Sequence, residues 1–324
     1  MMRGGAPEPL APDVYTQDLL AELPVLRKIA AIETRIFSNL DSSDMQPHHW
    51  VELAQLVHGA LEAFDGVVIV HGTDTMAYTA SALAFLLDRL AKPVILTGAQ
   101  KPLGDVRTDA RTNLVDACHL ATLPIPEVGI VFDSKLLRGC RTTKIDAWGM
   151  SAFASPNCPP LAELGLGVQL APHILPPGQP PPFDARLDAR VLAVRTFPGL
   201  DPKLLHGALA GGVRGLLIEA FGAGNVPQLE NSLIPVIDAA RGLDVPVVIV
   251  SQCTRGTVDL SRYVGGKAAQ EAGAISAHDM TVESSLALLM ITAGRAGEGG
   301  RIGATREAFA SPPAGAMGRS GAHV

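Results

Sequence analysis

Apolar and polar positions along the chain alternate in a pattern of short strands, each followed by a helix. Residues 66–70 form an apolar, β-branched run that predicts a buried strand. Residues 76–90 repeat apolar positions at helical spacing, which predicts a helix with one apolar face made of Leu83, Leu86, Leu87 and Leu90. The residues between them, 71–75, are small or polar and predict a loop.

The alternation continues on both sides of this unit. Further strands are expected at 34–37, 93–96, 128–132, 191–196, 215–218 and 245–250. Further helices are expected at 15–31, 47–63, 110–122, 202–211, 228–241, 268–272 and 282–293. Repeated strand and helix units are typical of α/β folds with parallel sheets.

A proline-rich stretch divides this pattern into two domains. Residues 172–183 contain six prolines, which neither a helix nor a central strand accommodates. We therefore expect a larger N-terminal domain over 1–171, with a flavodoxin-like parallel sheet, and a linker over 172–186. A smaller C-terminal α/β domain follows over 187–294. The Gly-, Ala-, Ser- and Arg-rich residues 295–324 predict a mobile tail with at most one helical turn at 306–309.

The loop at 71–75 is the best candidate for a functional site. Open α/β sheets bind ligands at the carboxyl ends of their strands, and the start of the following helix favours an anion or a developing oxyanion. Thr73 and Asp74 lie at this point. Both residue types are also common helix caps, so a purely structural role is an equal alternative from the local sequence. His71 is more simply explained as a packed, hydrogen-bonded histidine than as a catalytic one.

A threonine needs a partner before it can act as a nucleophile. Asp74 is adjacent to Thr73, and Lys144 is the only lysine between Lys135 and Lys203. Lys144 lies in a mostly uncharged stretch, where a desolvated lysine can serve as a base. The alternative is an ordinary surface charge.

Composition and charge exclude several classes of protein. Hydrophobic residues make up 47% and charged residues 18% of the chain, as in globular enzymes. The net charge of −6 and the absence of a basic stretch argue against nucleic acid or an anionic membrane as partner. Four widely spaced cysteines and the isolated pair His48-His49 argue against a metal site. No apolar run suits a signal peptide or a membrane span, so we expect a cytoplasmic protein.

Five segments together resemble the type I, cytoplasmic branch of the bacterial L-asparaginase family. The most specific is VHGTDTMAYTASAL at 70–83, with its strand and helix. The others are DSSDM (41–45), VILTGAQKP (94–102), RTTKIDAWGMSAFASPN (141–157) and EAFGAGNVP (219–227). The order and spacing of these segments agree with the family from residue 1 to about residue 293.

The resemblance implies an activity and a set of site residues. Members hydrolyse L-asparagine to L-aspartate and ammonia, use threonine chemistry without a cofactor or metal, and form homodimers or homotetramers. By resemblance, the catalytic residues are Thr73, Asp74 and Lys144. By the same resemblance, the residues expected to bind the substrate are Ser42, Ser43, Thr73 and Asp74, together with the backbone of Ala99.

Two departures from the family pattern affect the expected activity. Members carry a second catalytic threonine in a TGGT segment after an N-terminal strand. This sequence begins at residues 1–5 with MMRGG, which resembles the residues located just after the TGGT segment in the family. We therefore expect this chain to lack the first strand and to be nearly inactive. If the encoded upstream residues contain strand-GGT, we expect that adding them restores turnover. Glu219 stands where some type I enzymes have a basic residue, which argues against activation by asparagine.

Two other functions compete with asparagine hydrolysis. One is the related amidotransferase subunit that releases ammonia for tRNA-bound glutamate, although that subunit carries an additional N-terminal domain. The other is a non-catalytic module that binds amino acids. The presence of Thr73, Asp74 and Lys144 together argues against the second alternative.

Overall fold

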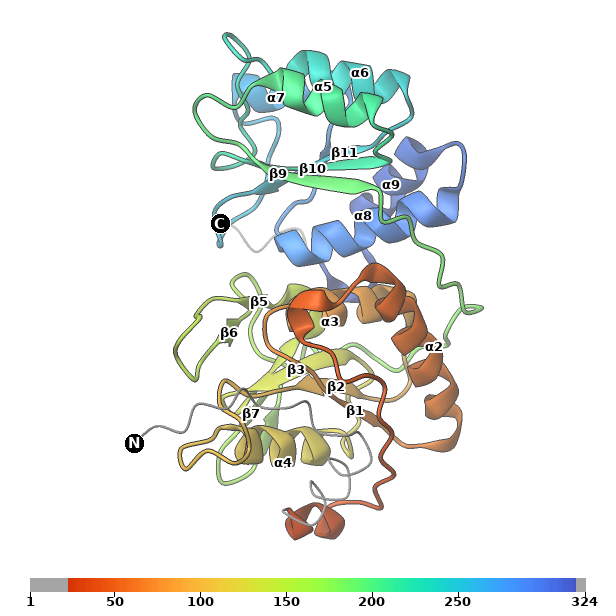
Figure 1. The fold of residues 1–324 in the computed structure, drawn as a ribbon, viewed down its shortest axis with the longest axis vertical. Coiled ribbons are helices and arrows are strands. Elements are labelled where there is room, and N and C mark those ends of the chain that lie inside the picture. The colour runs from red at the N-terminus through yellow and green to blue at the C-terminus, as the bar shows by residue number, and fades with distance from the viewer. Residues whose placement is uncertain (1–22, 319–324) are drawn as a thin grey trace.

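Two β-sheets, one in each half of the chain, carry the fold in the computed structural model (Figure 1). The structure describes residues 23–318, so the expected lack of a first strand, and residues 15–22 of the helix expected at 15–31, lie outside the described residues. Helices cover both faces of each sheet, and α3 and α8 lie between the two sheets. The molecule is thus an α/β protein of two domains.

The N-terminal sheet is mixed rather than wholly parallel. Its strand order is β1-β2-β3-β4-β7-β8, with β1 (Val67–Val70), β2 (Val94–Thr97), β3 (Val128–Phe132), β4 (Lys135–Arg138), β7 (Ala162–Leu164) and β8 (Val168–Leu170). The first three strands are parallel and the others antiparallel. Asp133 and Ser134, with φ of 50° and 57°, form a two-residue turn that reverses the chain after β3. Such a turn can only join antiparallel strands.

Helix α3 (Met76–Leu86) is buried on nearly every side, not on one face as expected. It lies on one side of the N-terminal sheet with α2 (Pro47–Ala63), while α4 (Ala110–Leu120) covers the other side (Figure 1). A helix that is apolar all round needs neighbours all round. The sheet supplies one neighbour and α8 of the other domain supplies the next.

The C-terminal sheet is all parallel, as expected. Its order is β12-β11-β10-β9, formed by β9 (Val191–Arg195), β10 (Gly215–Ala220), β11 (Val247–Ser251) and β12 (Ile275–Ser276). Three helices cover the outer face: α5 (Pro202–Ala210), α6 (Ile234–Gly242) and α7 (Val264–Ala272). The inner face packs against α8 (Val282–Ala296), with α9 (Arg301–Ala310) alongside.

One apolar core runs through both domains. Met76, Leu83 and Phe85 of α3 belong to the same buried cluster as Leu217 of β10 and Leu289 of α8. Separate clusters fill the space beneath α5 to α7 and beneath α4. The domains therefore share buried apolar surface, which is the dominant stabilising contribution in folding.

Several local expectations differ from the structure. The described part of the helix expected at 15–31 is only the 3-10 turn Pro24–Lys28, and the helix expected at 228–241 begins at Ile234. Residues 34–37 form no strand. Val70 is 55% exposed, because within the described residues β1 pairs only with β2 and leaves its other edge open. The tail expected from residue 295 instead continues α8 and forms the whole of α9, where Phe309 is fully buried in the shared core.

Several short elements complete the fold. A short antiparallel pair, β5 (Thr143–Lys144) and β6 (Phe153–Ala154), stands apart from the main sheet. Single turns of 3-10 helix occur at Pro24–Lys28, Ser42–Asp44, Gly139–Arg141 and Pro313–Gly315. Across residues 23–318, no helix combines the length and apolar character needed to cross a membrane.

A buried ion pair ties the proline-rich linker to the N-terminal sheet. Arg138 Nε and Nη2 donate to Glu127 at 2.5 and 3.0 Å, and both side chains are nearly inaccessible. Arg138 Nη2 also donates to His173 O, while Glu127 Oε1 accepts from Leu175 N. The additional hydrogen bonds satisfy the remaining atoms of the pair, which a buried ion pair requires.

Substituting Glu127 tests the contribution of this pair. Glu127→Ala leaves the Arg138 charge buried without its partner and should lower the free energy of unfolding by about 3–5 kcal/mol. Denaturation in guanidinium chloride measures the change. The control is Asp238→Ala, which breaks an exposed pair with Arg241 and should cost less than about 1 kcal/mol. Equal losses in the two variants would contradict the expectation.

Candidate active site

Thr73 and Asp74 lie in the loop between the carboxyl end of β1 and the start of α3. Close approach of backbone at two glycines shapes this loop. A Cβ atom on Gly72 would lie 2.6 Å from Ser42 Oγ, and one on Gly98 would lie 2.2 Å from His71 O. Only glycine allows these approaches, so the segments containing Ser42 and Gly98 pack directly against the loop.

Lys144 reaches this loop from the separate hairpin. Its Nζ donates to Thr73 Oγ1 at 2.9 Å and to Asp74 Oδ1 at 2.7 Å. The Lys144 side chain is 19% exposed, whereas that of Asp74 is 65% exposed. The structure thus brings together the three residues expected to be catalytic, with the lysine mostly covered and the carboxylate facing solvent.

Gln100 is a fourth member of the group that the sequence did not single out. Thr73 Oγ1 donates to Gln100 Oε1 at 3.2 Å, and Gln100 Nε2 donates to Gly149 O at 3.1 Å. Because its amide nitrogen is committed to a carbonyl, the amide oxygen must face Thr73. The signal was present in the sequence, since Gln100 follows the buried strand β2 as Thr73 follows β1.

Asp109 holds Gln100 in place. Its two carboxylate oxygens accept from Gln100 N and Lys101 N, each at 3.0 Å. Asn113 Nδ2 contacts the same carboxylate and also donates to Gly98 O. Asp109 is therefore part of the support of the site, rather than the solvated loop residue that its polar surroundings suggest.

The residues expected to bind substrate lie around this group. Ser42 is buried beside Gly72, and its carbonyl accepts from Thr75 Oγ1 at 2.6 Å. Ser43 is exposed, with its backbone N donating to Asp41 Oδ1. Ala99 lies in the loop after β2, between Gly98 and Gln100.

His71 is packed rather than available for catalysis. It is 8% exposed, and its ring nitrogens contact Gly72 O at 2.7 Å and Thr79 Oγ1 at 2.9 Å. Burial lowers the pKa of His71 below its ordinary value of 6.5, which the contact with Gly72 O partly offsets. We assign the neutral tautomer that donates from Nδ1 to Gly72 O and accepts at Nε2 from Thr79.

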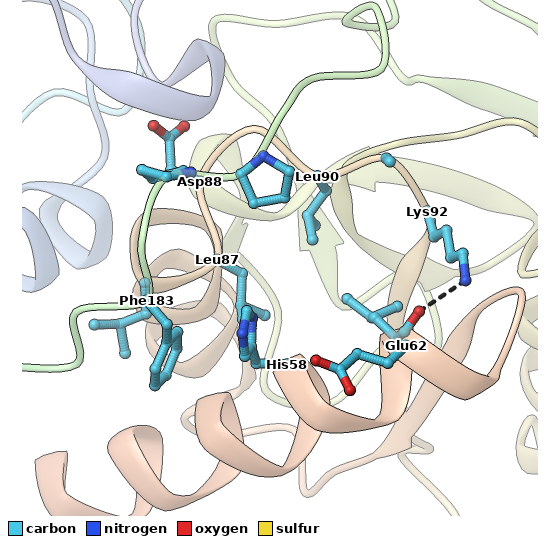
Figure 2. Close-up of a pocket in the computed structure, with 12 residues that line it drawn as sticks. His58, Glu62, Leu87, Asp88, Leu90, Lys92 and Phe183 are labelled. Atoms are coloured by element: carbon cyan, nitrogen blue, oxygen red, sulfur yellow. Dashed lines mark hydrogen bonds between the residues drawn. The ribbon is translucent and has the colours of Figure 1, made fainter.

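An apolar cavity lies elsewhere in the N-terminal domain. It has a volume of about 190 Å³ and is lined by α2, the residues after α3 and the linker, including the stacked rings of His58 and Phe183 (Figure 2). Lys92 Nζ donates to Leu61 O at its edge. The cavity contains neither Thr73 nor Lys144, so it is separate from the candidate active site.

The chemistry available at the site is that of a hydroxyl next to a lysine and a carboxylate. Lysine and aspartate beside a threonine hydroxyl can activate it, or a water held by it, for attack on a carbonyl carbon. Across residues 23–318, no three His, Cys, Asp or Glu side chains gather in a way that could hold a metal ion. The hydroxyl, amine and carboxylate that meet at this site are groups suited to acyl transfer.

Comparisons with known proteins match both domains. The family described as "Asparaginase, N-terminal" matches residues 2–174, and "Glutaminase/Asparaginase C-terminal domain" matches residues 190–305. The chain is 41% identical over 261 residues to L-asparaginase 1 of Escherichia coli, covering 77% of this chain and 75% of that protein.

Solved structures agree along almost the whole chain. The thermostable L-asparaginase from Thermococcus kodakarensis superposes with a TM-score of 0.86 at 37% identity, covering 94% of this chain and 92% of that one. L-asparaginase I from Vibrio cholerae also gives 0.86, at 34% identity, with 97% and 95% covered.

The buried histidine predicts how stability depends on pH. Because the pKa of His71 is lower in the folded than in the unfolded state, protonation favours unfolding, and stability is lost as the pH falls below about 6.5. His71→Gln should flatten this dependence, which has a limiting slope of about 1.4 kcal/mol per pH unit. Urea denaturation between pH 7.5 and pH 5 measures it.

The matched control is His119→Gln, since His119 is exposed near the end of α4. It should leave the slope of the wild type unchanged. The expectation is wrong if His71→Gln and the wild type lose stability in parallel as the pH falls.

Proposed function

The chain belongs to the type I bacterial L-asparaginase family, and from this premise we propose that it hydrolyses L-asparagine to L-aspartate and ammonia. The observation that carries the proposal is the pair of hydrogen bonds from Lys144 Nζ to Thr73 and Asp74. The mostly covered Lys144 amine contacts both the strand-end threonine and its neighbouring carboxylate, at 2.7–2.9 Å, so it is placed to act on the threonine hydroxyl.

In the proposed reaction, the Thr73 hydroxyl or a water bound to it attacks the side-chain amide carbonyl of asparagine. Lys144 accepts the proton from the attacking oxygen and returns it to the leaving nitrogen, which departs as ammonia. The negative charge of Asp74 stabilises Lys144 while it holds the proton. One water is consumed for each asparagine cleaved. The proposal assigns no residue to a second threonine, because the sequence contains no TGGT segment.

The substrate's α-carboxylate requires a positive environment, and its α-amino group requires a negative one. The start of α3 presents backbone N–H groups and a positive dipole end, which favour the carboxylate, and Ser42 and Ser43 lie beside it. The exposed carboxylate of Asp74 favours the amine. This arrangement supports a free amino acid as substrate, bound at the edge of the N-terminal sheet.

We also propose that the chain works as a homodimer or homotetramer. With the Asp74 side chain 65% exposed, the described residues of one chain leave the site open to water. Excluding water strengthens electrostatic interactions with a bound substrate. Light scattering after size-exclusion chromatography tests this part of the proposal, and a monomer would contradict it.

Replacing Thr73 separates an enzyme from a binding module. Thr73→Ala removes the hydroxyl that Lys144 contacts, and Lys144→Met removes the base, so each should lower kcat by about 10³-fold or more. Aspartate formed from L-asparagine, quantified by chromatography, gives the rate. The control is Thr122→Ala in the exposed turn after α4, which should retain the wild-type rate.

The two competing functions give different outcomes in the same assay. A binding module would show an asparagine-induced thermal shift without turnover, in the wild type and in both variants. An ammonia-releasing subunit would need tRNA-bound glutamate as acceptor for full activity. Turnover of L-asparagine that is unchanged in Thr73→Ala would overturn the assignment of this site.

A further inference from the structure

The hairpin that carries Lys144 is anchored from the C-terminal domain at both ends. Before the hairpin, the Arg141 guanidinium donates to both oxygens of Asp279, at 2.6 and 2.8 Å. After it, the Asn157 side chain donates to Asp279 O and accepts from Gly256 N, at 3.1 and 3.0 Å. The ends of this segment are therefore fixed to the loops that precede α8.

A third contact from the same domain falls next to the lysine itself. Thr143 Oγ1 donates to Glu283 Oε1 at 2.6 Å. Glu283 lies in the first turn of α8, which Thr281 caps through Ser284 N, and is 8% exposed. Burial raises the pKa of Glu283, while the Thr143 hydroxyl favours the ionised form. A polar group this deeply buried needs a hydrogen-bond partner, and Thr143 supplies one.

The position of Thr143 determines where Lys144 points. Successive side chains in a strand project to opposite faces, and β5 consists of these two residues. With Thr143 held against α8, Lys144 must project to the other face. The Thr73 and Asp74 oxygens are on that side.

We propose that Glu283 is a positioning residue that, through the Thr143 hydroxyl, orients Lys144 toward Thr73 and Asp74. This inference rests on the proposed function, because it assigns Lys144 a part in the reaction. It gives the C-terminal domain a direct part in building a site whose other side chains all come from the N-terminal domain.

Four substitutions at the two positions test the proposal. Thr143→Val keeps the shape and removes the donor, and Glu283→Ala removes the acceptor. Thr143→Ser keeps the hydroxyl donor, and Glu283→Gln replaces the carboxylate acceptor by an amide oxygen at the same position. The first pair should lower kcat about 10- to 100-fold with KM changed less than about threefold, since a displacement of 1 Å can cost about 10²-fold. The conservative pair should stay within about threefold of the wild type.

Chemical labelling gives a readout that does not depend on activity. Acetylation by an N-hydroxysuccinimide ester, followed by mass spectrometry, measures the reactivity of Lys144 relative to the exposed Lys203 in each protein. Freed from its partners, Lys144 should react several-fold faster in Thr143→Val and Glu283→Ala. The matched controls are Thr122→Val and Glu52→Gln, both at exposed positions, in which neither quantity should change.

The outcomes distinguish this inference from the proposed function. If asparagine turnover is absent both from this chain and from one extended by encoded upstream residues containing strand-GGT, the proposed function fails, and the labelling rates alone show whether Glu283 positions Lys144. Unchanged Lys144 labelling in Thr143→Val and Glu283→Ala overturns the inference, even where kcat falls. The inference is also overturned if kcat falls as far in Thr143→Ser and Glu283→Gln as in Thr143→Val and Glu283→Ala.

Discussion

Burial of α3 on nearly every side is the constraint on which the rest of the structure depends. A helix without a polar face cannot lie on the surface of one domain, so it requires a second layer. The C-terminal domain provides that layer through α8, and one apolar core results. Thr73 and Asp74 lie just before the N-cap of α3, so the loop that carries them leads into this buried helix. Fold and site therefore have a common origin in the composition of one helix.

Charged groups at this junction differ in what they contribute. The Arg141 side chain is 2% exposed and that of Asp279 12%, so removing either partner would leave a buried charge. The pair of Lys144 with Asp74 is the opposite case, because the Asp74 side chain is 65% exposed and such pairs add little to stability. The short contacts of Lys144 thus do not arise from the strength of that ion pair. They depend on a hairpin that stronger, buried interactions already hold.

The sequence predicted the parts of the fold that depend on local patterns. Strand and helix alternation located most elements, and the HGTDT loop and Lys144 are recognisable in the sequence as well as close together in the structure.

The parts that the sequence did not predict depend on contacts between distant segments. The exposure of Val70 depends on what pairs with β1, and α9 is held by burial of Phe309 in a core assembled from both domains. Gln100 follows β2 as Thr73 follows β1, but this position alone does not predict a role, because a glutamine side chain by itself indicates no particular chemistry. Its meaning comes from Thr73 on one side and Gly149 on the other.

The support of the site is consequently distributed over the whole chain. Gly72 and Gly98 permit the loops after β1 and β2 to touch, Asp109 orders the second loop, and the C-terminal domain orders the hairpin of Lys144. Each support acts on one reacting group or its neighbour, and together they extend from Gly72 to Glu283 in the sequence. A site of this kind needs positions fixed to within about 0.5 Å, which flexible loops alone do not provide. The close packing of α3 against α8 offers that rigidity, because packed interiors transmit displacements with little compression. The second domain is therefore best understood as part of the active-site scaffold rather than as an appended unit.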